Sequence, residues 1–429
     1  MAKPKKPLPE GVKVAFEAVM GRTRGRGIFG IEDEGDEVAR QAKLQRMAER
    51  IASYERGYEG SRRRCPQCGQ WQNYKGDATR ERVGEGGTLT IARASYVWPH
   101  CPTTTYPWDE KLGLGEEHEQ GRLREQLALV GVRVRYHQAP QVCQTLLGSE
   151  RYASSLRRVT VREAERLTSS THRHTLRKRE QDRIYLQIDG QLCPTRELRQ
   201  GPEDQGYREA KAVVAFSQAE VAEGSKERHE LLDKVLKAQV TDSEAFRLLV
   251  AEAYQQARGP QAAEVIVLAD GAHWIWNLVE ELIPHAVQIL DFSHAKQYLW
   301  EAAKLIYGAD SAFVRPWVKE REDLLFADQV EQVITHLHRF VDLVPGLVPI
   351  IHYFHHNQAR MRYGTYRQRG YFIGSGAIES AGKQLTVGRI KGPGMRWNVA
   401  DLNALLALRC VFLEHSWPAY WDAQAQLAA

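Results

Sequence analysis

The stretch Ile184-Tyr-Leu-Gln-Ile-Asp-Gly190 decides the fold class, because a second stretch, Val265-Ile-Val-Leu-Ala-Asp-Gly271, repeats its plan further along the chain. Both are short apolar runs that end in Asp-Gly. The first alternates as a half-buried strand does, whereas the second is continuously apolar, as in a strand buried on both faces. A third run, Ala286–Leu290, ends in Asp291. Since helical patterns separate such runs, we expect an α/β layer.

The three aspartates that end these runs, Asp189, Asp270 and Asp291, are the first candidates for a site. Binding sites in open α/β sheets form outside the carboxyl ends of the strands, so we expect these side chains to converge. Carboxylates brought together repel each other unless a cation neutralises them. Mg²⁺ prefers oxygen ligands, and two such ions about 3.5–4 Å apart stabilise both oxygens of an in-line displacement at phosphorus. Asp-Gly is also a common turn dipeptide, and this simpler interpretation stays open.

Further elements are predicted on both sides of these strands. Thr241–Arg258 is amphipathic with Thr241 as a plausible N-cap, and Gly374-Ser-Gly376 opens a helix that contains Glu379. The other candidates are two strands, Thr88–Val97 and Lys211–Phe216, and four helices, Glu37–Ser53, Gln329–Val341, Pro345–Tyr363 and Val399–Leu413.

Two consecutive helical patterns, Tyr136–Leu147 and Ala153–Leu167, are typical of a helix-turn-helix, with a short link at residues 148–151. The second helix carries Arg157, Arg158 and Arg162, which suit contacts to phosphates or guanine edges. Short helical pairs are also common in proteins that never bind DNA. A purely structural role is therefore the alternative.

Composition limits the class of protein. A chain of 429 residues needs several packing units, and its hydrophobic share of 43% is ordinary for a soluble globular protein. The N-terminus lacks the apolar core of a signal peptide, and the apolar runs fall short of the roughly 18 residues that a membrane span needs. Only Cys65 and Cys68 of the six cysteines are close together, which indicates a reducing compartment. We expect a cytoplasmic, nucleoid-associated protein, and the net charge of +5 permits an anionic partner.

Four motifs occur in a fixed order: Ile188-Asp-Gly190, Ala269-Asp-Gly-Ala-His-Trp-Ile-Trp276, Asp291-Phe-Ser-His294 and Gly374-Ser-Gly-Ala-Ile-Glu-Ser380. With the following Gly394-Met-Arg-Trp397, they resemble the ISKra-type insertion-sequence transposases. That family belongs with the ribonuclease-H-like Asp-Asp-Glu enzymes, near the Mutator-like group. The resemblance extends from about residue 60 to the C-terminal tryptophans, and it depends on the motifs together.

This resemblance implies a ribonuclease-H-like mixed sheet with a helical insertion, and a catalytic trio of Asp189, Asp270 and Glu379 that holds Mg²⁺ or Mn²⁺, with two ions expected. Glu379 thus takes the place that strand logic gave to Asp291. Asp291-x-x-His294 is similar to a secondary motif of the Mutator group, (Cys or Asp)-x-x-His, and is expected to be an accessory contact. The alternative is a helix start capped by Asp291 or Ser293.

The implied reaction is cleavage of phosphodiester bonds at the element ends, followed by attack of the 3′-hydroxyl on target DNA. The partners are double-stranded DNA, as terminal inverted repeats and target, and a second copy of the chain, since two ends must be paired. Trp397 either stacks on a flipped base or simply packs. The basic residues expected to line the DNA path are Lys383, Arg389, Lys391 and Arg396.

A damaged zinc module precedes these motifs. Cys65-Pro-Gln-Cys68-Gly69 is half of a zinc knuckle. The family resemblance places the second pair near Trp98-Pro-His-Cys101, where Trp98 replaces a cysteine and Cys101 remains. We therefore expect either a weak zinc site with Cys65, Cys68 and Cys101, or a fold without metal around its tryptophans.

These predictions divide the chain into six parts, with boundaries at 1–58 (polar, partly helical lead-in), 59–114 (degenerate zinc-ribbon-like module), 115–178 (helix-turn-helix domain), 179–294 (first part of the catalytic core), 295–367 (helical insertion) and 368–429 (C-terminal part of the core). An active transposase is the leading hypothesis. A catalytically silent or domesticated DNA-binding protein and a structure-selective nuclease are the alternatives.

Overall fold

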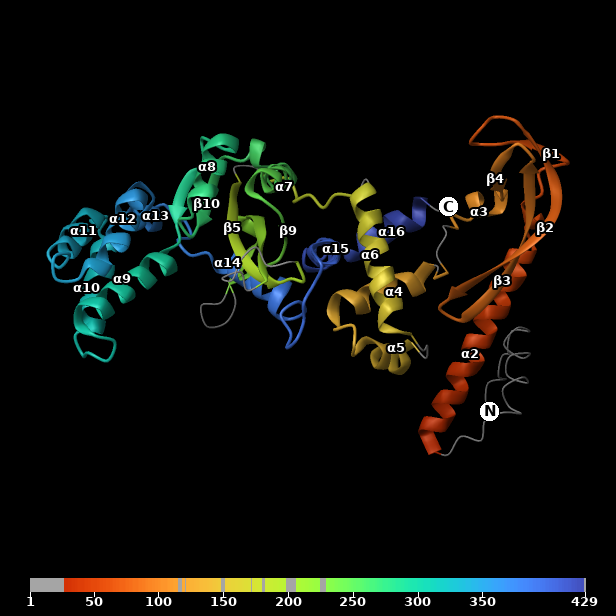
Figure 1. The fold of residues 1–429 in the computed structure, drawn as a ribbon, viewed down its shortest axis with the longest axis horizontal. Helices are drawn as coiled ribbons and strands as arrows, with labels where there is room; N and C mark the ends of the chain where they lie inside the picture. Colours follow the sequence, from red (N-terminus) through yellow and green to blue (C-terminus); the bar gives the residue numbers. More distant parts are fainter. Residues whose placement is uncertain are drawn as a thin grey trace, which may run out of the picture. The chain divides into compact units, whose positions relative to one another are not determined.

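The computed structural model describes residues 27–114, 118–119, 121–147, 151–170, 172–179, 182–197, 206–223 and 229–427 (Figure 1). The chain divides into two compact units. The first contains Met1–Gly131, Tyr136–Val159 and Ala419–Ala429, and the second contains Val132–Arg135 and Thr160–Pro418. In the described ranges, no helix is long and apolar enough to cross a membrane.

An antiparallel sheet and a long helix form much of the first unit. The helix α2 (Gly27–Ala52) packs against the sheet, and the strands run in the order β1-β2-β3-β4. The strands are β1 (Arg62–Arg64), β2 (Trp71–Gly84), β3 (Gly87–Trp98) and β4 (Cys101–Thr105), followed by the short helix α3 (Pro107–Lys111). The strand predicted at Thr88–Val97 is thus confirmed, and the helix predicted at Glu37–Ser53 begins earlier than expected.

Three further helices follow: α4 (Gly121–Arg133), α5 (Ala139–Leu147) and α6 (Ala153–Ser169). In α6, Leu156, Val159 and Ala164 are buried, whereas the three arginines selected from the sequence are exposed. Such a division of faces is expected of an amphipathic helix. Of the link predicted at residues 148–151, residues 148–150 lie outside the described residues.

A five-stranded mixed sheet is the centre of the second unit, with the order β11-β10-β5-β6-β9. Its strands are β5 (Arg183–Pro194), β6 (Tyr207–Ser217), β9 (Val235–Val240), β10 (Glu264–Ala269) and β11 (Val287–Leu290). β5 is antiparallel to β6, and β6 is antiparallel to β9, while β10 is parallel to β5 and β11 is parallel to β10. A separate two-stranded sheet joins β7 (Val221–Glu223) to β8 (His229–Leu231).

Helices cover this sheet because its strands are apolar on both faces. Val265–Ala269 in β10 are all buried, as the continuous apolar run predicts. The helices of this part are α7 (Ser243–Gln256), α8 (His273–Leu282), α14 (Gly376–Gly382), α15 (Val399–Leu413) and, beyond it, α16 (Trp417–Leu427). The N-cap of α7 is Asp242, whose side chain accepts a hydrogen bond from the backbone N–H of Ala245 at 2.8 Å. The expectation that Thr241 caps this helix is therefore wrong by one residue.

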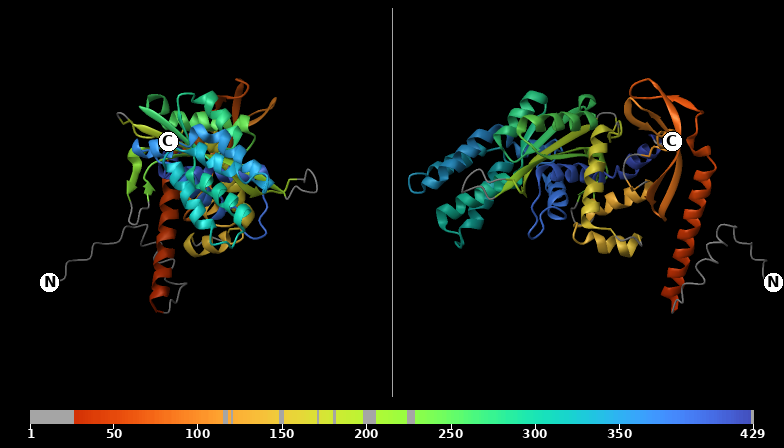
Figure 2. Two further views of the ribbon diagram at one scale, coloured as in Figure 1. Left: turned by 90° about the vertical axis from the view of Figure 1, so that its left-hand side faces the viewer. Right: turned by 45° about the vertical axis from the view of Figure 1, so that its right-hand side comes forward.

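Between Asp291 and residue 370 the chain forms a group of helices that pack on one another beside β10 and β11 (Figures 1 and 2). They are α9 (Phe292–Tyr307), α10 (Val314–Phe326), α11 (Val330–His338), α12 (Val348–Asn357) and α13 (Tyr363–Gln368). Of the apolar stripe expected on the helix at Gln329–Val341, Val330, Val333, Ile334 and Leu337 are buried, whereas Val341 is half-buried and lies beyond the end of α11. The helix expected over Pro345–Tyr363 is instead divided into 3-10 turns around α12, with prolines at the helix starts.

Candidate functional site

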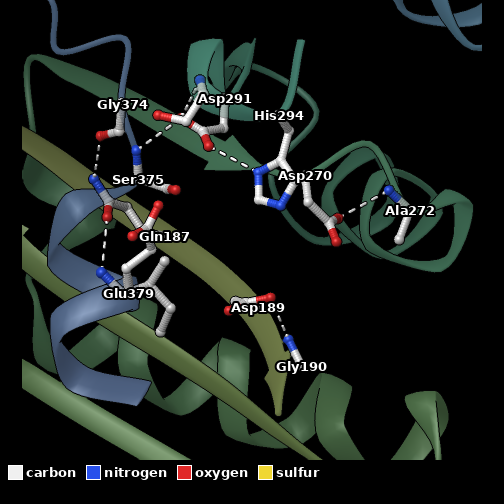
Figure 3. A network of polar contacts seen from close by, with 12 residues as sticks. Gln187, Asp189, Gly190, Asp270, Ala272, Asp291, His294, Gly374, Ser375 and Glu379 are labelled. Carbon is white, nitrogen blue, oxygen red and sulfur yellow. Dashed lines mark hydrogen bonds and ion pairs between the residues drawn. The ribbon is translucent and has the colours of Figure 1, made fainter. Parts of the chain in front are cut away.

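Asp189 and Asp270 lie on neighbouring strands of the second unit (Figure 3). The parallel ladder of β5 and β10 ends at the pair Ile188 and Ala269, and the next residue on each strand is the aspartate. Asp189 does not end its strand, because β5 continues to Pro194 in pairing with β6. The expectation of a strand end at Asp189 is thus corrected: Asp189 marks the point where β10 leaves β5.

Burial changes the protonation of Asp189. It raises the pKa of this carboxyl, and the nearby charge of Asp270 adds to the rise. Hydrogen bonds from the Gln191 side chain at 3.0 Å and from the backbone N–H of Gly190 at 2.7 Å oppose it. A positive charge placed beside both aspartates would therefore stabilise the ionised pair.

Asp291 is fully buried and forms the N-cap of α9. One of its oxygens accepts from the backbone N–H of Ser293 at 3.3 Å and of Ser375 at 3.0 Å, and the other meets Nδ1 of His294 at 2.8 Å. Burial by itself would raise the pKa of Asp291, but these contacts, first that of His294, lower it below the ordinary value. Asp291 is thus a cap and an ion-pair partner, as the simpler alternative from the sequence describes.

His294 stands between this buried carboxylate and the two aspartates of the sheet. The hydrogen bond to Asp291 raises the pKa of the imidazole above its ordinary value, although burial opposes the rise. The charges of Asp291, Asp270 and Asp189 also raise it. An imidazolium at this position offsets part of the negative charge that the aspartates accumulate.

Glu379 is on α14, which contacts β5 and β6. The buried side chain of Gln187, in the middle of β5, fixes the start of this helix: its amide nitrogen donates to the carbonyl of Gly374 at 3.3 Å, and its oxygen accepts from the backbone N–H of Ile378 at 3.0 Å. Together with the bond from Ser375 to Asp291, these contacts hold the glycine turn against the sheet (Figure 3). The segment that carries Glu379 is therefore fixed beside the strand that carries Asp189.

The carboxylate of Glu379 is partly exposed and lines a cavity of about 810 Å³. Its oxygen is 3.6 Å from the ammonium of Lys383, one turn later. In the described part of the chain, Asp189, Asp270 and Glu379 do not form a group whose ligand atoms all lie within 4.8 Å of one another. The structure thus places the two aspartates at neighbouring strands and Glu379 on a helix that contacts one of these strands, without bringing all three carboxylates within ligand distance of one another.

A group that does meet this distance is formed by Cys65, Cys68 and Cys101 in the first unit. Gly69, with φ of +69°, lets the chain turn back, and backbone bonds between Cys65 and both Gln70 (2.8 Å) and Gly69 (2.9 Å) close the turn. Cys101 begins β4, directly opposite Trp98. Three thiols in this arrangement can hold a metal ion, and thiolate ligands suit zinc. His100 is outside the group, and its ring lies against Trp98 at 5.2 Å between centroids.

The basic residues expected along a DNA path differ in their accessibility. Lys383 is exposed, Lys391 is half-buried, and Arg396 donates to the carbonyl of Thr195 at 3.2 Å. Arg389 is only 1% exposed, with its guanidinium 5.2 Å from the ring of Trp397, so its assignment to the DNA path does not fit this structure. Trp397 is buried as well and donates to the carbonyl of Ile390 at 3.1 Å, which agrees with the packing alternative.

Comparison with known proteins adds no identification. No protein-family model matches the chain, and none of the curated proteins is significantly similar to it. Residues and geometry of the chain itself therefore carry the functional argument.

Proposed function

We propose that the chain is a transposase, a metal-dependent enzyme that cuts DNA at insertion-sequence ends and joins the 3′-hydroxyl to target DNA. The observation that carries this proposal is the placement of Asp189 and Asp270, which both come directly after the last residue pair of the ladder between the parallel strands β5 and β10. Two carboxylates side by side are a donor set that fits a hard divalent cation such as Mg²⁺ or Mn²⁺.

Strand order supports the proposed class, a ribonuclease-H-like Asp-Asp-Glu transposase near the Mutator-like group. Such a catalytic core has three consecutive strands paired antiparallel, followed by two parallel strands on the other side of the first strand. The sheet order β11-β10-β5-β6-β9 has this arrangement. The helices from α9 to α13 correspond to the insertion that this class carries before its glutamate. Fold alone does not define activity, so the argument depends on the site.

In the proposed mechanism, Asp189, Asp270 and Glu379 hold two metal ions, which when bound would stabilise the attacking and leaving oxygens of phosphoryl transfer. The three carboxylates do not all lie within 4.8 Å of one another, so they would have to come closer together around the ions, Glu379 among them. Its ion pair with Lys383 joins two exposed side chains, so releasing it costs little. Gln187 and Asp291 keep the backbone of the glutamate segment in place, and His294 offsets negative charge beside the aspartates.

DNA binding is proposed for the exposed arginines of α6, Arg157, Arg158 and Arg162, and for the accessible lysine and arginine side chains near Glu379. The Arg158 side chain is half exposed, and its guanidinium is 3.8 Å from the carboxylate of Glu119, which is buried. Two DNA ends must be joined to one target, so a dimer or higher oligomer of the chain is part of the proposal.

We also propose zinc for the three-cysteine cluster, in a structural role. Three thiolates leave the fourth tetrahedral position to water or to another donor. Hydrogen bonds from Thr103, first from its backbone N–H, lower the pKa of the Cys101 thiol and favour the ligating form. The alternative from the sequence, a module that folds without metal, predicts that purified protein contains no zinc.

A second candidate is a DNA-binding protein that keeps the fold and has lost the reaction. The observation that favours it is that Asp189, Asp270 and Glu379 do not all lie within 4.8 Å of one another in the described part of the chain. Incubation of the full chain with DNA from the flanks of its own gene separates the candidates. The transposase predicts nicking that requires Mg²⁺ or Mn²⁺ and joining of the 3′ ends to a second DNA. Binding without nicking would support the silent protein, and nicking without joining would support a structure-selective nuclease.

A further inference from the structure

A tyrosine of the helical insertion reaches the backbone of Asp270. Tyr353, on α12, donates its hydroxyl hydrogen to the carbonyl oxygen of Asp270 at 2.9 Å. We propose that Tyr353 is a positioning residue, which fixes the Asp270 turn and thereby the affinity of the site for its divalent cation. This inference rests on the proposed function, because it assigns Asp270 to a metal.

The turn that follows Asp270 leaves no spare room on the side of Tyr353. Gly271 has φ of +97°, and a Cβ added there would lie 2.9 Å from the Tyr353 ring and 2.9 Å from a methyl group of Leu290. Residues other than glycine are therefore excluded, both by the positive φ and by the lack of space for a Cβ. Since the ring and Leu290 close the turn from two directions, the peptide that follows Asp270 has little freedom to shift.

Two hydrogen bonds then set the orientation of Asp270. Its carboxylate accepts from the backbone N–H of Ala272 at 3.0 Å, which fixes the side chain. Its carbonyl accepts from Tyr353, which fixes the peptide between Asp270 and Gly271. Loss of the second bond would remove one restraint on this peptide, so that the Asp270 carboxylate would be held less firmly in its orientation. Partners that orient a ligand in this way typically account for about 10–100-fold in metal affinity.

Tyr353 is itself held in place by the insertion. Its ring stacks on that of Tyr298 from α9, with centroids 3.9 Å apart and an angle of 26° between the planes. The neighbouring Phe354 is fully buried. The hydroxyl is thus presented to Asp270 by packing between two helices, so that a defined bond joins the insertion to the Asp270 turn.

The test uses Tyr353→Phe, which keeps the ring and removes the hydroxyl, in the full-length protein. Tyr298→Phe is the matched control, because within the described residues the hydroxyl of Tyr298 has no hydrogen bond. Titration with Mn²⁺ followed by electron paramagnetic resonance measures binding, and the Mg²⁺ dependence of nicking gives a second measure. We expect the half-saturating metal concentration to rise about tenfold for Tyr353→Phe, with the nicking rate restored at saturating Mg²⁺, and no change for Tyr298→Phe.

Two outcomes would overturn the inference alone, and a third would overturn the proposed metal site as well. Unchanged Mn²⁺ binding in Tyr353→Phe would show that the bond does not position the ligand. A lower nicking rate at all Mg²⁺ concentrations, with unchanged half-saturation, would assign Tyr353 to another role. Asp270→Asn provides the reference: if it binds Mn²⁺ as the unaltered protein does, the metal assignment of the proposed function fails together with the inference.

Discussion

The cysteine cluster of the first unit and the carboxylate site of the second unit differ in how far they are assembled. Cys65, Cys68 and Cys101 lie within 4.8 Å of one another, although two of them belong to a turn and the third begins a distant strand. Asp189, Asp270 and Glu379 do not reach this distance, although a ladder and a buried glutamine fix the segments that carry them. The fold thus brings the three thiols together without a metal ion, but not the three carboxylates.

Charge explains the difference. Thiols are neutral when protonated, so three of them can share a small volume at little electrostatic cost. Carboxylates are charged at neutral pH and repel each other in a poorly solvated site. Burial is the main cause of the raised pKa of Asp189, and repulsion from the charge of Asp270 adds to it. We therefore expect the carboxylate site to close only around cations, whereas the thiol site is assembled before a metal ion binds. The following variants test this expectation.

The largest effect is expected for the aspartates. Asp189→Asn or Asp270→Asn should abolish nicking, because each removes a charged ligand and leaves an amide with similar shape. DNA binding should remain, since neither residue belongs to the exposed arginine set. Gel shift and nicking assays on the same preparations measure both. Lys304→Gln, at an exposed position in the last turn of α9, is the control. Near-normal nicking in either aspartate variant would remove that residue from the site.

Zinc content should fall almost as sharply in the first unit. Cys101→Ser is expected to reduce bound zinc from about one ion per chain toward zero, because it leaves two thiolates. His100→Ala is the matched control, since this neighbouring side chain packs on Trp98 and lies outside the cluster. Metal analysis of the purified proteins measures the difference. Equal zinc loss in both variants would mean that His100 supplies the fourth ligand, so that the site would have four protein ligands and not three.

Much of the fold follows from local patterns. The apolar run Val265–Ala269 predicts β10, and α15 spans the predicted residues Val399–Leu413. In contrast, β9 was missed, because its lysine and glutamine break the apolar run. Its free edge is covered instead by α15, where Asn403 bonds to both backbone groups of Val240 and Glu414 accepts from Leu236. Such tertiary bonds leave no mark in the spacing of a single segment.

The site was predictable only in part for a similar reason. Asp189 and Asp270 follow apolar runs, so strand logic selects them. The importance of Gln187 was not recognised, although a polar residue inside an apolar strand is a signal that it meets a buried partner. Tyr353 was hidden among the histidines of α12, and its bond joins residues that are far apart in sequence. Arg389 was misassigned because burial beside Trp397 is decided by packing and not by charge pattern.

A smaller effect is expected for the arginines of α6. Replacement of Arg157, Arg158 and Arg162 by alanine should weaken DNA binding and reduce the salt dependence of the logarithm of the binding constant by about 2–3 units of slope. The reason is that each phosphate contact releases condensed counterions. Both metal sites should be unaffected, which zinc analysis and Mn²⁺ titration can verify. An unchanged slope would favour the structural alternative for this helix.

The smallest effect concerns the pH dependence of stability through His294. Its pKa is raised in the folded state, so its contribution is complete below the unfolded value of about 6.5 and is lost as pH rises through the folded value. Asp291, with a lowered pKa, contributes above about pH 3.9 and loses its contribution only as pH falls through its folded value. The pair is therefore at full strength between roughly pH 4 and 6.5.

His294→Gln keeps a donor for Asp291 and removes the charge. Its melting temperature should lie further below that of the unaltered protein at pH 5.5 than at pH 9, whereas His338→Gln, at an exposed position, should show no such trend. A gap that is constant with pH would mean that the imidazole is neutral throughout. In that case the aspartates of the sheet would have no resident positive charge beside them, and the contrast between the open carboxylate site and the closed thiol site would be larger than proposed.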